Sequence, residues 1–194
     1  MGVTKELSQL GAHFTLAEAA RVGLTASDLG DLIDQGEVFQ REPGERYARA
    51  GSPSALWLDI WDATTALKGS VACLETALAW YGLAPEIPKR TQIAVPRGSA
   101  TEANFRLPVE VFEYDPDTFD VGAGLVEVNR GCDAPIYTDH RAVADVITRR
   151  DLVSEERARE IVRRYKPRAD SHMTHTARLL GVESQVAEFL ASTT

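Results

Sequence analysis

The sequence predicts an α+β protein in which an N-terminal winged helix-turn-helix precedes a mixed α/β domain. Between residues 14 and 49, two short helical patterns are followed by two short strand patterns, the order expected of a winged helix-turn-helix. After residue 55, helical patterns give way to strand patterns and then return, which is typical of an α+β layer arrangement. The expected domains are residues 1–50 and 55–194, with a boundary at the turn-rich stretch 51–54.

Three helices are expected in the N-terminal domain, the first over residues 1–12. Capping boxes predict the starts of the other two: Thr15 is followed three residues later by Glu18, and Thr25 by Asp28. Apolar spacing places one face of each helix in a common core. The expected core side chains are Leu7, Leu10, Leu16, Ala19, Ala20, Leu29, Leu32 and Ile33.

Glycines and a hairpin complete this motif. Gly23 permits the tight bend between the two capped helices, and Gly36 ends the second one as a C′ residue. Residues 38–41 and 46–49 are then predicted as two strands, the wing, around the turn-rich residues 42–45.

The second domain is expected to place its strands between two groups of helices. Helices are predicted at residues 55–68, 71–81, 141–149, 155–165, 174–180 and 183–190, with Ser70 and Ser154 as N-caps. Strands are predicted at residues 92–95, 105–114 (broken at Pro108), 125–129 and 136–137.

Acidic side chains dominate the composition. The formal net charge is −8. By segment, the net charge is −3 for residues 1–50, −7 for residues 51–140 and +2 for residues 141–194. Attraction to phosphates depends on a local basic face, so the overall charge does not exclude a nucleic-acid partner. No apolar run suits a membrane span or a signal peptide, and two cysteines do not make a disulfide framework, so a cytoplasmic location is expected.

The helix-turn-helix and the wing supply candidate DNA contacts. Residues 25–35 include three aspartates and no cation, so only short polar side chains are left to contact base edges. A capping role, or simple exposure to solvent, explains the presence of these polar side chains equally well. The wing offers arginines for phosphate contacts and a tyrosine that can pack beneath them. The candidate DNA-binding residues are Thr25, Ser27, Gln35, Arg41, Arg46, Tyr47 and Arg49.

A second basic stretch lies between residues 149 and 168, where eight cations accompany four acids. The candidate polyanion patch, for DNA or RNA, comprises Arg149, Arg150, Arg163, Arg164, Lys166 and Arg168. The alternative is a solvated helix laced with ion pairs to Glu156 and Glu160.

The remaining candidate sites are weaker. Arg141 and Asp145 are four residues apart and favour a structural ion pair. His172 and His175 lack a third ligand at metal-binding spacing, so no metal and no cofactor are expected. The sequence contains no phosphate-binding loop, nucleophile elbow or zinc-protease helix, and no enzymatic activity is expected.

The chain resembles the AbiEi antitoxins, transcriptional regulators of type IV toxin–antitoxin systems. The likeness covers residues 14–38, which resemble the family's winged-helix opening, and residues 77–98, where an Ala/Leu helix leads to a strand ending Pro-Arg-Gly. It extends to residues 136–145, which are similar to the family's strand-to-helix junction with an Arg and an Asp four apart.

The resemblance implies that the N-terminal domain binds inverted repeats in the promoter of its own operon and represses it. It also implies that the second domain counters a nucleotidyltransferase-like toxin without a stable complex. Two protomers would then fill two half-sites of the operator, either dimerised beforehand or assembled cooperatively on the DNA. Two alternatives stay open. One is an interaction module that has lost DNA binding and whose acidic second helix binds the toxin directly. The other is an undetected nuclease or transferase in residues 55–194.

Overall fold

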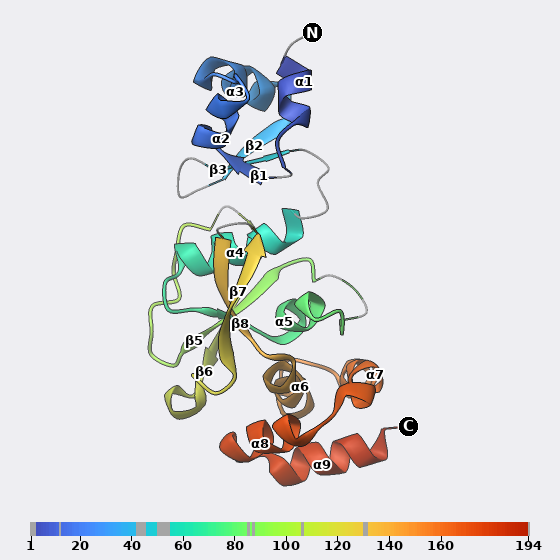
Figure 1. Ribbon diagram of the computed structural model, residues 1–194. Coiled ribbons are helices and arrows are strands. Elements are labelled where there is room, and N and C mark those ends of the chain that lie inside the picture. The colour runs from blue at the N-terminus through green and yellow to red at the C-terminus, as the bar shows by residue number, and fades with distance from the viewer. Residues whose placement is uncertain are drawn as a thin grey trace.

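The α+β class is confirmed by the computed structural model, in which helices and strands are interspersed up to residue 96, and further strands are then followed by a group of helices (Figure 1). The structure describes residues 3–11, 13–41, 46–49, 55–84, 86, 88–105, 107–129 and 132–193. The expected boundary at residues 51–54 and the turn of the wing at residues 42–45 lie outside the described residues.

The N-terminal part combines short helices with a small antiparallel sheet. Its elements are α1 (Val3–Ser8), β1 (His13–Thr15), α2 (Leu16–Arg21), α3 (Ala26–Asp34), β2 (Val38–Arg41) and β3 (Arg46–Arg49). The strand order is β1-β3-β2, and both pairings are antiparallel. Strand β1 is absent from the sequence prediction because three residues before a helix are too few to show an alternating pattern.

Both predicted capping boxes are present. The Thr15 side chain accepts a hydrogen bond from the backbone N–H of Glu18, whose carboxylate in turn accepts from the backbone N–H of Thr15. Thr25 and Asp28 repeat this arrangement at α3. Gly23 and Gly36 have φ values of +92° and +70°, the left-handed backbone predicted for the bend and for the C′ position.

The N-terminal core forms a hydrophobic cluster of its own. Its buried members are Leu7, Leu10, Phe14, Ala19, Leu24, Leu29, Leu32, Val38 and Tyr47, with Leu16, Val22 and Ile33 partly buried against them. Two details of the prediction are wrong: α1 ends at Ser8, not at residue 12, and Ala20 is exposed. The short α2 turns Ala19 inward and leaves Ala20 facing solvent.

The second part contains a five-stranded sheet and several helices. Its elements are α4 (Ala55–Ala66), β4 (Val71–Ala72), α5 (Leu74–Trp80), β5 (Thr91–Pro96), β6 (Val109–Tyr114), η1 (Pro116–Thr118), β7 (Ala123–Asn129), β8 (Cys132–Tyr137), α6 (Asp139–Thr148), α7 (Glu155–Tyr165), η2 (Lys166–Arg168), α8 (Ser171–Leu179) and α9 (Glu183–Ser192). The strand order is β6-β5-β4-β8-β7. Strands β5 and β6 are parallel, as are β4 and β8, while the other two pairs are antiparallel.

The helix predicted over residues 71–81 is wrong at its start. Val71 and Ala72 form β4, the central strand, and α5 begins only at Leu74 with Cys73 as its N-cap. Ser70 does not cap this helix, because its hydroxyl donates to the carbonyl of Leu67. Short apolar runs are ambiguous between helix and strand, and here pairing with β5 and β8 decides the conformation.

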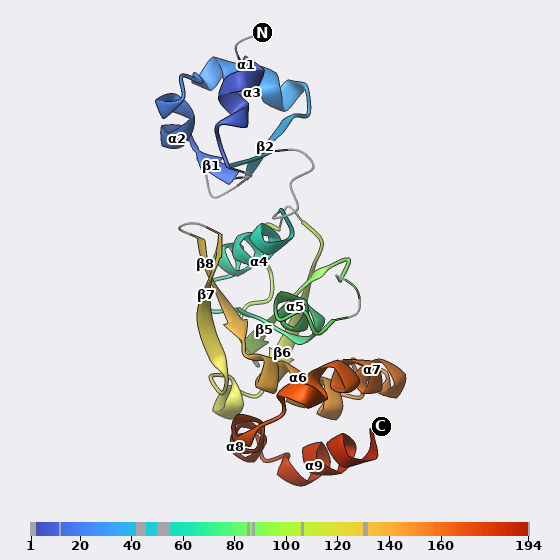
Figure 2. The same ribbon diagram turned by 45° about the vertical axis from the view of Figure 1, so that its right-hand side comes forward.

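Ala63 of helix α4 and Leu67, which follows its end, pack against one face of the sheet in a cluster with Ile93 and Val95 of β5. The intervening Ala94 belongs to the larger cluster that contains buried side chains of α5, α6, α7 and α8. Helices α6 to α9 gather at one end of the sheet (Figures 1 and 2). In the part of the chain that the structure describes, no helix is both long and apolar enough to cross a membrane.

Candidate nucleic-acid interface

Thr25 is engaged at the start of α3. Its hydroxyl lies 2.6 Å from Asp28 Oδ2, and the backbone N–H of Thr25 donates to the same oxygen at 2.8 Å. These hydrogen bonds hold the pKa of Asp28 below its usual range. The capping explanation for Thr25 is therefore confirmed, and a base contact would compete with the cap.

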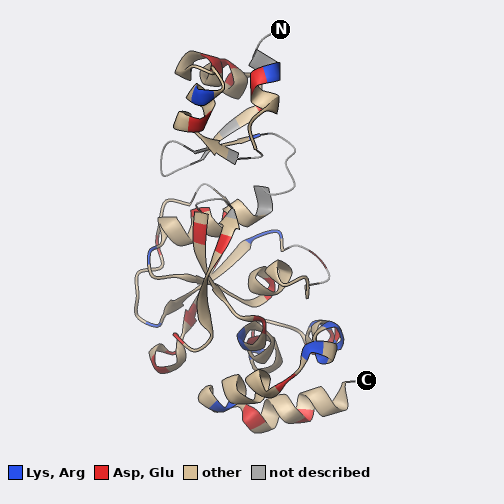
Figure 3. Cartoon of the chain, viewed as in Figure 1, with Lys and Arg blue, Asp and Glu red and all other residues tan. Residues whose placement is uncertain are grey.

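The exposed surface of α3 is acidic. Ser27 in its first turn and Gln35 at its C-cap are exposed, as two DNA contacts would have to be, but Asp31 and Asp34 are exposed with them. Figure 3 shows the acidic positions of α3 in red. Carboxylates facing phosphates are repelled, so α3 by itself supplies no electrostatic attraction to DNA.

The hairpin β2–β3 brings two of the predicted wing arginines together. Arg41 and Arg46 are direct register partners at the end of the ladder, although their side chains lie outside the description. Arg49 is half-buried, and its Nη1 donates to the carbonyl of Leu10 at 3.3 Å. Arg49 therefore ties the hairpin to the segment after α1, in addition to any phosphate contact.

Tyr47, which the sequence places beneath the arginines, lies in the core. The ring is 9% exposed and stacks on Phe14, its register partner on β1, with centroids 5.6 Å apart and an interplanar angle of 17°. An offset or stacked aromatic pair of this kind stabilises the fold. Its burial makes Tyr47 a packing residue and leaves its ring no open face for a base.

Most members of the candidate polyanion patch make contacts within the chain. Arg149 pairs with Asp151 at 3.4 Å, and Arg164 pairs with Glu160 at 3.5 Å. Lys166 Nζ donates to the carbonyl of Thr193 at 2.6 Å, and Arg168 Nη1 donates to the carbonyl of Tyr81 at 3.0 Å. Arg163 is exposed, and the Arg150 guanidinium lies over the ring of Phe189 at 4.5 Å.

Helix α7 carries further ion pairs that fit the alternative of a salt-bridged helix. Arg159 binds Glu155 one turn earlier through Nε and Nη2, at 3.0 and 2.7 Å. Arg157 reaches Glu75 on α5 with two hydrogen bonds of 3.0 and 2.8 Å. These contacts neutralise much of the positive charge that the sequence concentrates between residues 149 and 168.

The Arg141–Asp145 ion pair predicted from the spacing is present and deeply buried. Arg141 Nε donates to both carboxylate oxygens of Asp145, at 3.0 and 3.1 Å, and the two side chains are 2% and 8% exposed. Arg141 Nη1 donates to the carbonyls of Thr118 and Val121, both at 2.7 Å. The guanidinium also lies 4.4 Å from the centroid of the Tyr137 ring. This network ties α6 to the turn that follows β6.

Burial raises the pKa values of Asp145 and of the thiol and phenol beside this ion pair, which makes the thiol and phenol unreactive at neutral pH. Burial raises the pKa of Asp145 to about 6, against the opposing effect of the Arg141 guanidinium. Burial likewise raises the pKa of the Cys73 thiol and of the Tyr114 phenol, so both stay protonated at neutral pH. A protonated thiol is a poor nucleophile. Cys73 and Cys132 are both buried thiols outside any disulfide, as expected of small apolar side chains.

His172, one of the two histidines weighed as metal ligands, packs against a third histidine. His172 stacks on His140, with centroids 5.9 Å apart and an interplanar angle of 4°, and not on His175. His140 Nδ1 is 2.7 Å from the Tyr165 hydroxyl, while Asp170 caps α8 by accepting from the backbone N–H of His172. Within the described ranges, no three His, Cys, Asp or Glu side chains are arranged to hold a metal ion.

Two features escaped sequence reasoning. Arg141 is buried because it binds carbonyls of a turn that is distant in the sequence, and no local sequence pattern predicts such contacts. A pocket beside Arg150 and Phe189 is built from segments far apart in the sequence, and of its lining residues the sequence pattern identified only Arg150 as a candidate. Arg150 and Phe189 are too far apart in the sequence to form a recognisable motif.

Comparisons with known proteins add a distant structural likeness. No protein-family model matches the chain. No curated protein matches it either. Among solved structures, the chain is similar to the RV2827C protein from Mycobacterium tuberculosis, with 15% identity and a TM-score of 0.49. This match covers 99% of this chain and 80% of that one. The likeness is too distant to carry an argument about fold or function.

Proposed function

We propose that the chain is an autoregulatory antitoxin whose N-terminal part binds operator DNA as a winged helix-turn-helix. In this proposal it represses the operon that encodes it together with a nucleotidyltransferase-like toxin, as its resemblance to the AbiEi antitoxins implies. The second part counters the toxin without forming a stable complex with it.

The observation that carries the DNA-binding part is the order of the N-terminal elements. A helix and a strand precede two capped helices joined at Gly23, and a hairpin follows whose inner strand pairs with β1. In DNA-binding proteins of this kind the second helix of the helix-turn-helix lies in the major groove, and the hairpin contacts the backbone. Helix α3 and the hairpin β2–β3 occupy those positions in the chain.

Charge decides which of these elements holds the DNA. Helix α3 exposes Asp31 and Asp34 and contains no cation, whereas the hairpin carries Arg41, Arg46 and Arg49. The hairpin therefore supplies the phosphate contacts, and Ser27 and Gln35 are left as the exposed polar groups of α3 that reach base edges.

A mobility-shift titration tests this proposal. The probe is the DNA upstream of the chain's own gene, and a scrambled duplex of equal length is the control. We expect a shift of the upstream probe at low salt and a weaker one of the scrambled probe. No shift of either duplex at low salt would remove the repressor function.

The acidic surface of α3 favours a second candidate function, a protein-interaction module that binds the toxin directly. Exposed carboxylates on a short helix suit a basic partner surface, through complementary charge. Co-expression with the neighbouring gene separates the two functions. Size-exclusion chromatography is run at 150 mM salt, where the Debye length is about 8 Å. A complex that survives supports direct binding, and separate elution supports the type IV mode.

A further inference from the structure

A pocket of ≈ 370 Å³ lies where the end of α6, the start of α7 and the length of α9 meet. Its wall combines apolar Ile147 and Phe189 with four charged side chains, those of Arg150, Arg159, Glu155 and Glu188. Volumes of this order are typical of small-molecule sites, which pair an apolar wall with a few convergent polar groups.

Arg150 is the cation of this pocket whose hydrogen-bond donors are unused. Its guanidinium lies over the Phe189 ring at 4.5 Å, and among the described residues its N–H groups donate no side-chain hydrogen bond. After the hydrogen bond and charge of Arg159, the Arg150 charge also helps to lower the pKa of the Glu155 carboxylate. Arg159 lies 5.1 Å from the same ring but is bound to Glu155 through two hydrogen bonds. Stacking on a ring fixes the plane of a guanidinium and leaves its N–H edge free for an oxyanion.

Two further polar side chains in the wall are unused. Among the described residues, neither the Gln185 amide nor the Glu188 carboxylate makes a recorded hydrogen bond or ion pair. By contrast, the hydroxyls of Thr148 and Ser192 donate to backbone carbonyls of their own helices. The available groups are therefore one cation, one amide and one anion.

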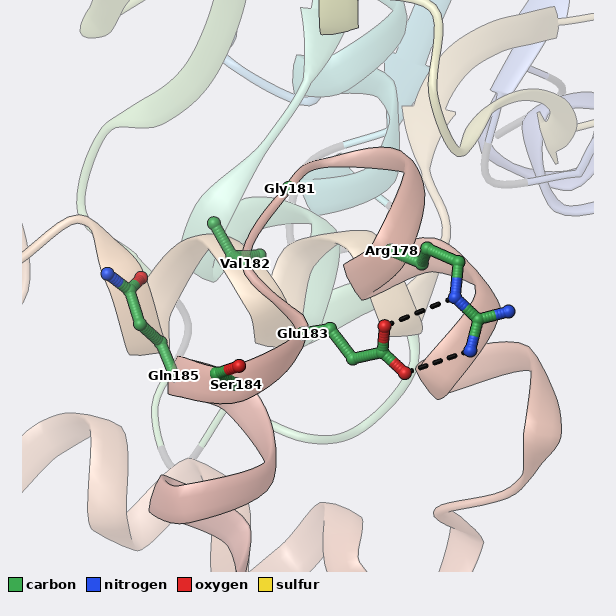
Figure 4. Close-up of a pocket in the computed structure, with 6 residues that line it drawn as sticks. All are labelled: Arg178, Gly181, Val182, Glu183, Ser184 and Gln185. Atoms are coloured by element: carbon green, nitrogen blue, oxygen red, sulfur yellow. Dashed lines mark hydrogen bonds and ion pairs between the residues drawn. The ribbon is translucent and has the colours of Figure 1, made fainter.

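A neighbouring pocket serves as a comparison, because its charged side chains are paired with each other. That pocket, of ≈ 380 Å³, lies at the turn between α8 and α9 and contains Arg178 and Glu183 (Figure 4). Their side chains satisfy each other through hydrogen bonds of 3.1 and 2.9 Å. This hollow offers no spare charge to a ligand, whereas the pocket at Arg150 does.

From this contrast we infer that the pocket at Arg150 binds a nucleoside monophosphate. The phosphate accepts hydrogen bonds from the N–H edge of Arg150. Because the Glu188 carboxylate would repel the phosphate, the base lies at Glu188 instead and donates its N–H groups to that carboxylate. Ile147 and Phe189 form the apolar wall for the base and sugar. The volume of the pocket equals that of many water molecules, at about 30 Å³ for each. A ligand that fills the pocket is therefore larger than a phosphate group alone. This site is independent of the proposed DNA binding by the N-terminal part.

Calorimetry on the full chain tests the inference, with adenosine 5′-monophosphate as the probe and inorganic phosphate and L-glutamine as comparisons. Arg150→Ala should weaken binding of the nucleotide at least about tenfold, since a hydrogen bond to a charged group is lost. Glu188→Ala should weaken binding of the nucleotide but should not weaken that of inorganic phosphate, because the carboxylate repels the phosphate and binds the base. Arg164→Ala is the matched control, because it removes one exposed arginine charge from outside the pocket; it should change neither.

Four results would overturn the inference. The first is the absence of heat from the nucleotide at millimolar concentration. The second is inorganic phosphate binding as tightly as the nucleotide. The third is L-glutamine binding in place of the nucleotide, and the fourth is equal affinity of wild type and Arg150→Ala. Thermal unfolding of each variant in the absence of ligand shows whether a lost affinity reflects a lost fold.

Discussion

Arg141 and Asp145 form a two-hydrogen-bond ion pair one helical turn apart, and the core of the protein encloses both. The pair is not a surface contact of helix α6, since the guanidinium also binds the carbonyls of Thr118 and Val121. Gly122 lies against it: a Cβ at this position would come within 2.7 Å of the Arg141 Cβ. The ion pair therefore fixes the position of the turn after β6 relative to α6.

Removing one member of this pair should be far more damaging than removing both. Arg141→Met removes the hydrogen bonds of Arg141 to a buried carboxylate and to the carbonyls of Thr118 and Val121, and should lower the free energy of unfolding by about 3–5 kcal/mol. The double variant Arg141→Met/Asp145→Leu should recover much of that loss in urea titrations. A double variant no more stable than Arg141→Met would show that the carbonyl contacts, and not the charge pair, carry the stability.

The Arg141→Met variant should also be more stable in acid than at neutral pH. The folded-state pKa of Asp145 is already raised from 3.8 to about 6, and the loss of Arg141 removes a group that lowers it. A raised folded-state pKa means that the folded state binds the proton more tightly, so stability falls as pH rises through that pKa. Unfolding at pH 5 and pH 8 checks this, and a pH-independent difference from wild type would contradict it.

Thr25 offers a test of the capping explanation. Thr25→Ala removes the hydroxyl acceptor at the start of α3 and should cost about 1 kcal/mol, while Thr25→Ser should restore the cap and the stability. Thermal unfolding of the two variants measures the difference. An alanine variant with unchanged stability but lost DNA affinity would instead make Thr25 a base contact.

Tyr47 separates packing from recognition. Because the ring is buried on Phe14, Tyr47→Ala should cost about 3–5 kcal/mol, whereas Tyr47→Phe should stay within about 0.5 kcal/mol of wild type. The phenylalanine variant should also bind DNA normally in a mobility shift. If its affinity dropped while its stability did not, the hydroxyl would have to be assigned to the interface.

Local sequence patterns were sufficient to predict α2, α3 and the bend between them. The caps at Thr15 and Thr25 and the glycines at positions 23 and 36 act within a few residues of one another, so the helices and their bend follow from the sequence. Strand β1 could not be predicted in this way, because its partner β3 lies far along the chain.

The second part shows the limits of such patterns. Val71 and Ala72 look like the start of a helix, and only their pairing with Ala94 and Ile136 across the sheet makes them a strand. Likewise, the basic stretch of residues 149–168 looks like a polyanion surface until its partners on α5, α7 and the C-terminal residues are in place. Arg150 remains as the arginine of this stretch that faces a pocket with its donors unused.

The salt dependence of DNA binding tests the central claim most directly. Fluorescence anisotropy with labelled upstream DNA, over a series of salt concentrations, gives the slope of log affinity against log salt for wild type, Arg46→Ala and the control Lys68→Ala. Each lost phosphate contact should reduce the slope by about 0.9. We predict that reduction for Arg46→Ala and an unchanged slope for Lys68→Ala. Wild-type affinity that is absent at low salt, or that is unaffected by Arg46→Ala, would contradict DNA binding through the hairpin.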